Sequence, residues 1–533
     1  MSSVAGIIPR ADSYQGIERD RAILRERGIP ALYLDDRSIG IIFDGELYNS
    51  VELRRDLQAL GCRLRSDSSA ELVLQLYQKH GTLAFAMLNG AFTFAVLDDR
   101  SHTVILVRDP LGVMPLYLFK DGSKIVFSSR LNDILAIPEL DLNFDPYGIR
   151  DFLVFGYVQA PLTCFQAISR LEAGTYVKAT NGVVAHYRYW EPEYCEPYPA
   201  PSLNSAKEEF LSLLEVSLKY ALSGKVGLIL DGSLGARSLA YLAQRSGEKF
   251  AAVTLDEVLK EQEMFEQFDD ALELLDEPLA DPSLFPLCAA ARELKQVCGT
   301  VVCAAGSHEI LAGYARYAEM LSVAMPYQQR FGAFLDRSSY WREGVALLRD
   351  QHLAPRELRH WKYFDEQPLL NGMLAYDTKT YLPECTLNGM HAVFSAHGLH
   401  VRAPFLDRRV FEYLAKLPQA FKLNPNGIGQ WLLREALQEH LPSDILTRHL
   451  TPAGFSADKF VSALREKVRE TLSDSSLNVL DEVLNMESLR DVVQGYYDHG
   501  RGSPVRVWNL FLLCAWTKGM LGRKALSGLR RAA

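Results

Sequence analysis

Residues 225–244, KVGLILDGSLGARSLAYLAQ, contain a short apolar run, a loop of small residues and a helical pattern in direct succession. Residues 299–314, GTVVCAAGSHEILAGY, have the same order. Short continuous apolar runs that lead into helices are typical of buried parallel strands, whose following loops meet at one edge of the sheet. The two stretches therefore predict an α/β region with a parallel sheet. This region passes into a helical C-terminus, with segments such as residues 429–441 and 504–521.

The N-terminal part of the chain has a different pattern. Strand-like apolar runs at residues 38–49, 90–99 and 102–112 alternate with helical patterns such as residues 69–80. The second and third runs are separated by a short polar turn and predict a hairpin. We therefore expect an α+β region with a mainly antiparallel sheet.

A proline-rich stretch separates the two patterns. Pro192, Pro197, Pro199 and Pro201 fall close together, and proline is excluded from continuous helix and from central strands. We therefore predict two domains with a linker between them, namely residues 1–190, the linker 191–204 and residues 205–533.

The composition limits the possible partners. The chain has 533 residues, 48% of them hydrophobic and 23% charged, which is typical of a soluble globular protein. Its net charge of −9 gives no basic surface for a phosphate backbone, so we expect no nucleic acid partner. Apolar stretches such as residues 507–516 are shorter than the ~20 residues of a membrane span, so we expect no membrane partner. The N-terminus lacks a secretory pattern, and the eight cysteines form no CxxC pair, which predicts reduced thiols and a cytoplasmic location.

Seven phrases along the chain point to one family. They are FDGELYNSVELRRDL, NGAFTFAVLDD, RDPLGVMPLY, LDEPLADPS, DTKTYLPE, HVRAPFLDRRV and WLLREAL, in this order. Together they resemble the glutamine-dependent asparagine synthetases and their relatives, which include β-lactam synthetases and lasso-peptide cyclases. The resemblance spans essentially the whole chain. It implies an Ntn-hydrolase-like αββα glutaminase sandwich, followed by a parallel α/β domain of the PP-loop ATP pyrophosphatase type with a helical C-terminus.

The glutaminase motifs of the family are altered. Ser2 stands where the family has its nucleophilic cysteine, and a hydroxyl needs a stronger base than a thiol. The family's N-G-E oxyanion loop is Asp44-Gly45-Glu46 here, which places an acceptor where a donor must face the oxyanion. Its S-D-T-E motif is SSAE at residues 68–71, although Asp67 lies nearby. We therefore predict no glutaminase activity.

The ATP-binding motifs are altered as well. The family's S-G-G-x-D-S loop is DGSLGA at residues 231–236, and Asp231 adds a negative charge where phosphates would lie. In the second loop, Ala305 and His308 replace two acidic residues that the resemblance assigns to Mg²⁺. We therefore expect no ATP, no Mg²⁺ and no other cofactor.

Histidines occupy several positions of the inherited synthetase pocket. His391 stands where the family has an aspartate, and His400 stands where it has a glutamate that serves as a base. With His308, three imidazoles replace acidic residues. Because imidazole has a pKa of about 6.5, it suits proton transfer near neutral pH. We predict acid–base, acyl-transfer or cyclisation chemistry with His400 as the base, assisted by His391 and His308.

Other side chains complete this predicted site. Asp231 and Glu309 would orient the imidazoles. The residues that we expect to bind the substrate are Ser233, Cys303, His397, Arg402 and Phe394. We expect no metal, because His391, His397 and His400 do not share one helical face. In the alternative interpretation, these histidines serve packing and hydrogen bonding in a protein that has lost its catalytic role.

Three hypotheses follow from these motifs. In the first, the chain is a repurposed biosynthetic enzyme that acts on a small molecule, in particular a specialised metabolite. In the second, it is a non-catalytic scaffold or regulator. In the third, it is a divergent ATP-dependent amide-forming synthetase. Besides a small-molecule substrate, the partners considered are a second copy of the chain and another enzyme of the same pathway.

Overall fold

The computed structural model contains two compact units that interleave in sequence. The first comprises Met1–Asn143, Ala160–Glu191 and Lys524–Ala533, and the second comprises Phe144–Gln159 and Pro192–Arg523. The domain limits given above stay a prediction. The structure describes all residues except 1–2, 10–30, 35–37, 122–123, 138–139, 141–142, 181–182, 197–198, 256, 259–266, 340–343, 350–362, 367, 444–445, 447–456 and 530–533.

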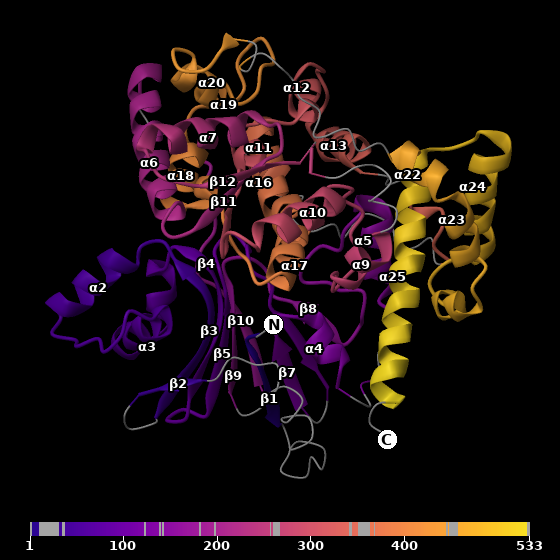
Figure 1. Cartoon of the computed structure of the whole chain (residues 1–533), viewed down its shortest axis with the longest axis horizontal. Helices are drawn as coiled ribbons and strands as arrows, with labels where there is room; N and C mark the ends of the chain where they lie inside the picture. Colours follow the sequence, from indigo (N-terminus) through magenta and orange to yellow (C-terminus); the bar gives the residue numbers. More distant parts are fainter. Residues whose placement is uncertain are drawn as a thin grey trace. The chain divides into compact units, whose positions relative to one another are not determined.

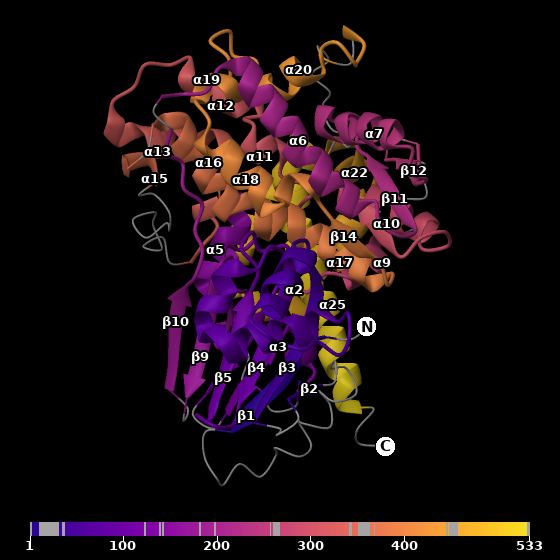
Figure 2. The ribbon, with the colours of Figure 1, turned by 90° about the vertical axis from the view of Figure 1, so that its left-hand side faces the viewer.

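The first unit contains two antiparallel sheets (Figures 1 and 2). The larger sheet has the strand order β10-β9-β5-β4-β3-β2, and the smaller has the order β1-β7-β6-β8. The strands of the larger sheet are β2 (Leu32–Tyr33), β3 (Ile39–Leu47), β4 (Gly90–Asp98), β5 (Thr103–Arg108), β9 (Thr175–Thr180) and β10 (Val183–Arg188). Those of the smaller sheet are β1 (Ala5–Pro9), β6 (Tyr117–Lys120), β7 (Lys124–Ser128) and β8 (Ile168–Arg170). The predicted hairpin is present as the pair β4 and β5.

Two buried cores hold these layers together. Helices α2 (Ser50–Ala59) and α3 (Ser69–His80) pack on one face of the larger sheet, and the smaller sheet packs on its other face. Side chains alternate along a strand, so β4 sends Phe92 and Phe94 toward the helices and Ala95 toward the other sheet. Helix α4 (Leu131–Leu135) lies against β7. The αββα sandwich implied by the resemblance is confirmed.

The second unit is built on a four-stranded sheet in which every strand pair is parallel. The order is β12-β11-β13-β14, with β12 at Ala251–Thr254, β11 at Val226–Leu230, β13 at Thr300–Val302 and β14 at His400–Arg402. Val302 pairs with Arg402, and Thr300 pairs with His400. The carboxyl ends of the strands therefore meet at one edge, as predicted from the two strand–loop–helix stretches.

Helices make up most of the second unit (Figure 1). They are α5 (Pro146–Phe155), α6 (Leu203–Ala221), α7 (Leu234–Ser246), α9 (Phe268–Glu273), α10 (Leu284–Leu294), α11 (Ser307–Ile310), α12 (Ala315–Leu321), α13 (Arg330–Ser338), α15 (Tyr363–Glu366), α16 (Leu369–Lys379), α17 (Asn388–Ala396), α18 (Arg408–Lys416), α19 (Gln419–Lys422), α20 (Trp431–Leu437), α22 (Ala457–Ala463), α23 (Arg465–Leu472), α24 (Met486–His499) and α25 (Pro504–Leu529), which belongs to this unit up to Arg523. The last four form the helical C-terminus that the sequence predicts.

Helix α25 belongs to an aromatic core. Trp508 contacts Phe268 and Phe285 edge to face, and its indole Nε1 donates to the carbonyl oxygen of Ala280 at 3.0 Å. Trp508 and Trp516 are each 1% exposed. Within the part of the chain that the structure describes, no helix has both the length and the apolar content needed to cross a membrane.

Candidate active site

A cavity of about 580 Å³ lies in the second unit, beside the carboxyl ends of β11 and β13. Ligands of open parallel sheets bind at this edge, and the volume is in the range of small-molecule sites. The polar side chains that line the cavity are those of Asp231, Ser233, Asp281, Ser283, Cys303, His308, Glu309, Tyr314, Tyr381 and Thr386.

The loop between β11 and α7 forms one wall. The Asp231 Oδ1 accepts a hydrogen bond from the Ser233 backbone N–H at 2.9 Å. Ser233 is the N-cap of α7, and its hydroxyl oxygen accepts from the Ala236 backbone N–H at 3.1 Å. Both side chains therefore bind backbone amides at the start of the helix. These amides belong to the loop that would cradle phosphates in the family.

Gly235 stands where the resemblance places a loop aspartate. A Cβ atom at this position would lie 2.5 Å from the Ser307 Oγ and 2.9 Å from the Ser307 Cβ. Real Cβ contacts are longer, so a larger side chain fits only if Ser307 moves. The space that the family's aspartate would occupy is thus filled by a side chain of the second loop.

Glu309 on α11 is the most buried acid of the cavity, with 2% of its surface exposed. Its Oε1 accepts a hydrogen bond from the Tyr314 hydroxyl at 2.7 Å. Burial raises the pKa of Glu309 above its ordinary value, and the nearby His308 offsets part of this effect. The His308 ring stacks on Tyr314 with 5.0 Å between ring centroids. Such a carboxyl is suited to accept a proton at neutral pH.

A buried ion pair holds Tyr314 in position. The guanidinium carbon of Arg316 lies 4.2 Å from the centre of the Tyr314 ring. Arg316 is itself bound to Asp377, with 2.7 Å between nitrogen and oxygen, and Tyr317 also donates to Asp377. Tyr381 meets Tyr314 edge to face at 5.8 Å. The Tyr314 side chain, whose hydroxyl donates to Glu309, is therefore held in place by aromatic and ionic contacts.

Burial also raises the pKa of two further side chains that line the cavity. The Asp281 Oδ1 accepts from the Ser283 backbone N–H at 2.9 Å, and burial raises the pKa of Asp281. Burial also raises the pKa of the Cys303 thiol to about 12. Cys303 is therefore a neutral thiol that can donate a hydrogen bond but is a poor nucleophile.

The cavity unites half of the residues predicted from the sequence. Asp231, Ser233, Cys303, His308 and Glu309 all line it. They come from the two loops that follow β11 and β13, which the parallel topology brings to one edge.

The other predicted residues are placed elsewhere. His400 is exposed and begins β14, so it lies at the amino end of a strand whose carboxyl end faces the site. His391 lies on α17, and His397 at the end of this helix binds the Val393 carbonyl oxygen through its Nδ1 at 2.8 Å. Phe394 is 0% exposed and belongs to the core. None of these four residues is among the described residues that line the cavity.

Arg402 has a structural environment. Its Nη1 donates to the Ala221 carbonyl oxygen at 3.1 Å and to the Ser223 carbonyl oxygen at 2.8 Å, which satisfies carbonyls at the end of α6. Its guanidinium also stacks on the Tyr220 ring at 5.2 Å. Arg402 thus ties α6 to the sheet and does not line the cavity.

The motif analysis missed Asp281, Tyr314 and Tyr381. Asp281 lies in LDEPLADPS, and Tyr381 lies in DTKTYLPE, so both belong to phrases that carry the resemblance. Tyr381 is followed by a π-helix, η4 (Leu382–Leu387), which contributes Thr386 to the cavity. Short π-helical segments occur frequently at functional sites, but no simple sequence pattern reveals them.

The segments that correspond to the family's glutaminase motifs lie in the first unit. Ser2 is outside the described residues. Asp44 and Gly45 lie inside β3 and pair with Thr93 and Phe92 of β4. A Cβ atom at residue 45 would meet the Ala91 carbonyl oxygen at 2.2 Å, so glycine is required there.

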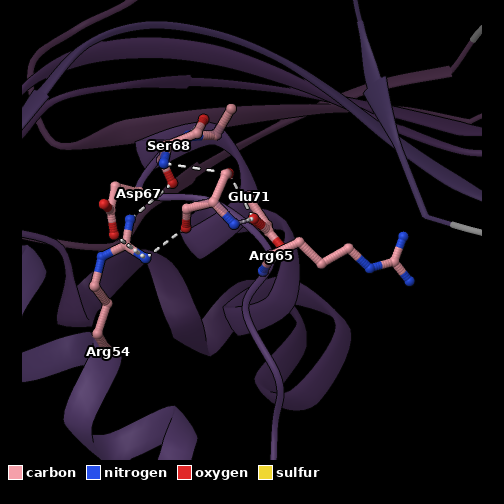
Figure 3. A network of polar contacts seen from close by, with 7 residues as sticks. Arg54, Arg65, Asp67, Ser68 and Glu71 are labelled. Atoms are coloured by element: carbon pink, nitrogen blue, oxygen red, sulfur yellow. Dashed lines mark hydrogen bonds and ion pairs between the residues drawn. The ribbon is translucent and has the colours of Figure 1, made fainter.

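Glu71 of the SSAE segment and the preceding Asp67 have separate roles (Figure 3). Glu71 accepts from the backbone N–H groups of Arg65 and Ser66 at 2.7 Å each, while the Arg65 side chain extends away from it. Asp67 is fully exposed and lies 3.8 Å from Arg54. Glu71 thus fixes the turn before α3, and Asp67 is a surface residue.

Residues 21–190 match a glutamine amidotransferase domain, and residues 240–518, more than half of the chain, match the asparagine synthase family. The chain belongs to the asparagine synthase family. The resemblance found from the seven phrases is therefore confirmed.

Its relatives share about a quarter of their residues with it. Asparagine synthetase [glutamine-hydrolyzing] 1 of Bacillus subtilis is 24% identical, over 94% of this chain and 89% of the relative. A putative asparagine synthetase [glutamine-hydrolyzing] of Mycobacterium bovis is 25% identical, over 89% and 84%. Among solved structures, the glutamine phosphoribosylpyrophosphate amidotransferase of B. subtilis matches 52% of this chain and 57% of that one, with 14% identity. Its TM-score of 0.22 is too low to support a statement about fold.

The expectation that the chain uses no cofactor is wrong, because enzymes of the asparagine synthase family use ATP and Mg²⁺. For the prediction of a cofactor, membership of this family takes precedence over the altered loop motifs. Among the described residues, no group of three or more His, Cys, Asp or Glu side chains could hold a metal ion by itself, but Mg²⁺ that accompanies a nucleotide needs only one or two carboxylates besides the phosphates. The carboxylates that line the cavity are those of Asp231, Asp281 and Glu309.

Proposed function

We propose that this asparagine synthase-family chain is an enzyme that transfers an acyl group and forms an amide or a related acyl bond on a small molecule in the cavity of the second unit. The observation that carries the proposal is Glu309, a buried carboxyl group that lines the cavity and is held by Tyr314. Buried acids with shifted pKa values and fixed partners are typical of catalytic groups.

The proposed roles follow from the geometry. A nucleophile with an N–H or O–H group attacks the acyl carbon, and Glu309 takes its proton as the new bond forms. The bond between the acyl carbon and its leaving group breaks, and the leaving group departs with the bonding electron pair. His308, which stacks on Tyr314 beside the cavity, is the second proton-transfer group. His400 has no role in this scheme, because it lies at the other end of β14.

The test is turnover by the purified full-length chain with carboxylic acids, amines and ATP with Mg²⁺, with amide products detected by mass spectrometry. A general base contributes about 10²–10⁴ in rate, so Glu309→Gln should lower kcat by at least about a hundredfold. The exposed Glu215→Gln on α6 is the matched control. Equal rates for wild type and Glu309→Gln would refute the role of Glu309.

We further propose that the first unit does not release ammonia from glutamine. Two observations support this. Asp44 presents an acceptor at the position of an oxyanion donor, and Asp67 is fully exposed. The purified chain should release no glutamate from glutamine above the buffer rate. Glutamate release that disappears in Ser2→Ala would contradict this proposal.

A second candidate function is that of a non-catalytic scaffold or regulator. It is favoured by the Asp231 and Ser233 side chains, which bind the backbone amides of the former phosphate loop. In that case Glu309→Gln would leave the pathway product unchanged in cells, and the chain would co-purify with an active enzyme.

A specialised-metabolite substrate, assembly with a second copy or a pathway enzyme, and a cytoplasmic location are further parts of the proposal.

A further inference from the structure

We infer that Trp508 of α25 is a positioning residue of the candidate active site, because it holds the part of the cavity wall that residues 279–283 form (the wall segment). Trp508 itself is not among the described residues that line the cavity. The effect of Trp508 on turnover rests on the proposed function, whereas the anchoring of the wall segment is tested without turnover. The residues of the wall segment that line the cavity are Leu279, Asp281, Pro282 and Ser283.

Ala280, the remaining residue of the wall segment, is bound through both of its backbone groups. Its N–H donates to the Gly156 carbonyl oxygen at 2.8 Å, and its carbonyl oxygen accepts from the Trp508 indole Nε1 at 3.0 Å. Gly156 is the C-cap of α5, whereas Trp508 lies on α25, 228 positions from Ala280 in sequence. The two bonds therefore attach the wall segment to two separate helices of the second unit.

The wall segment has a bonded turn of its own and a close contact with α5. The Asp281 Oδ1 accepts from the Ser283 backbone N–H at 2.9 Å, which fixes the shape of the segment. A Cβ atom at residue 156 would lie 3.1 Å from the Ala280 Cβ, so a side chain there would press on the wall segment. The shape of the segment is thus local, whereas its position is set by the anchors on α5 and α25.

The Trp508 ring is firmly packed. Its centroid lies 5.9 Å from that of Phe268, 5.9 Å from that of Phe285 and 5.0 Å from that of Phe460. Phe285 lies on α10, which begins directly after the wall segment, and α25 runs beside α9 and α10 (Figure 1). Because side chains of a dense core keep one position on average, the indole N–H holds the Ala280 carbonyl oxygen at a fixed point.

The wall segment shares the cavity with the groups of the proposed reaction. Glu309 and His308 line the same cavity from α11. A substrate that lies against the wall segment therefore meets Glu309 at a distance that depends on where the segment is held. A misplacement of about 1 Å can lower a rate about a hundredfold. Trp508 thus acts on turnover through Ala280 and not by contact with the substrate.

Hydrogen exchange of the full chain, followed by mass spectrometry, tests the anchor without turnover. Trp508→Phe keeps an aromatic ring and removes the indole N–H. The loss of one neutral hydrogen bond should raise the exchange rate of the wall-segment amides about three- to tenfold. The amides of residues 303–309 should exchange as in the wild type. The matched control is Trp516→Phe, which alters a tryptophan of the same helix with the same exposure of 1% and should leave the wall segment unchanged.

Turnover is the second measurement. With the substrates of the proposed reaction, Trp508→Phe should lower kcat about tenfold and leave KM within about threefold of the wild type, because the side chains that line the cavity remain. Trp516→Phe should keep the kcat of the wild type. Gly156→Ala disturbs the other anchor of Ala280 and should reproduce both the faster exchange and the lower kcat. It carries the test if Trp508→Phe does not fold.

Unchanged exchange of the wall segment in Trp508→Phe would overturn the inference, as would equal kcat values for Trp508→Phe and Trp516→Phe. Faster exchange throughout the second unit in both tryptophan variants would show that Trp508 serves only the core, and would overturn the inference as well. A wild-type chain without turnover would refute the proposed function only, and exchange alone would then decide the inference. A chain that forms amides at the same rate in all variants would refute the inference only.

Discussion

Asp109 in the first unit and Glu309 in the second are both buried carboxyl groups, and they differ in their partners. Burial raises the pKa of both, that of Asp109 to about 6. The Asp109 carboxylate accepts three backbone N–H groups at 2.9–3.1 Å, from residues 111, 113 and 114. Glu309 accepts one hydrogen bond from a tyrosine and faces a cavity.

This comparison shows that a raised pKa alone does not identify a functional acid. Asp109 lies in RDPLG, where Arg108 also donates to the carbonyl oxygens of Gly112, Met114 and Leu171. These hydrogen bonds all bind backbone groups. Around Glu309, the bonds instead fix a tyrosine at the wall of an accessible space. Asp109 thus maintains the fold, whereas the proposed role of Glu309 is to act on a ligand.

The largest expected effect is that of Asp109→Ala. This change leaves three buried N–H groups without acceptors, and each costs about 1–3 kcal/mol, so we expect a loss of at least ~3 kcal/mol in the free energy of unfolding. Urea denaturation of the full chain measures it. Asp67→Ala, which alters a fully exposed aspartate, serves as the control and should unfold like the wild type. Similar midpoints for the two variants would show that the turn does not depend on Asp109.

Arg402→Ala should have the next largest effect. The loss of charged hydrogen bonds to the end of α6 should cost about 2–3 kcal/mol of stability. Because Arg402 does not line the cavity, amide-forming turnover at a temperature where the variant is folded should stay within about twofold of the wild type. A large loss of turnover with unchanged stability would return Arg402 to the binding site predicted from the sequence.

His400→Ala should have a small effect on both properties. The side chain is exposed at the amino end of β14, and substitutions at such positions change stability by less than about 0.5 kcal/mol. Amide-forming turnover should be unchanged as well. An inactive but folded variant, shown by turnover and urea denaturation together, would show that His400 is the catalytic base. The active site would then not be the cavity described above.

The contrast between His400 and Glu309 shows how far the sequence could predict this site. The apolar runs before residues 231 and 303 predict parallel strands, and parallel strands bring the loops after them together. Asp231, Cys303, His308 and Glu309 could therefore be assigned to one site before the structure was known. The fold itself was predictable because seven ordered phrases preserve the turns and buried strands of the family.

The remaining residues depend on tertiary contacts. The three-residue strand β14 is too short to show which of its ends faces the cavity, so His400 could not be placed from its family position. Arg316, Asp377 and Tyr314 form one network although Arg316 and Asp377 are 61 positions apart in sequence. Asp281 lines the cavity together with Glu309 of α11, and no local sequence pattern reveals that these two residues share a site.

The unfolding free energy of Glu309→Gln tests the central claim most directly. If Glu309 is kept for a ligand, its burial costs stability, and the variant should be as stable as the wild type or more stable. Because the pKa of Glu309 is raised on folding, the wild type loses stability as pH rises above the ordinary carboxyl range, so the advantage of the variant should be larger at pH 8 than at pH 5. A destabilisation comparable to that of Asp109→Ala, independent of pH, would show that Glu309 is a structural residue and would contradict the account.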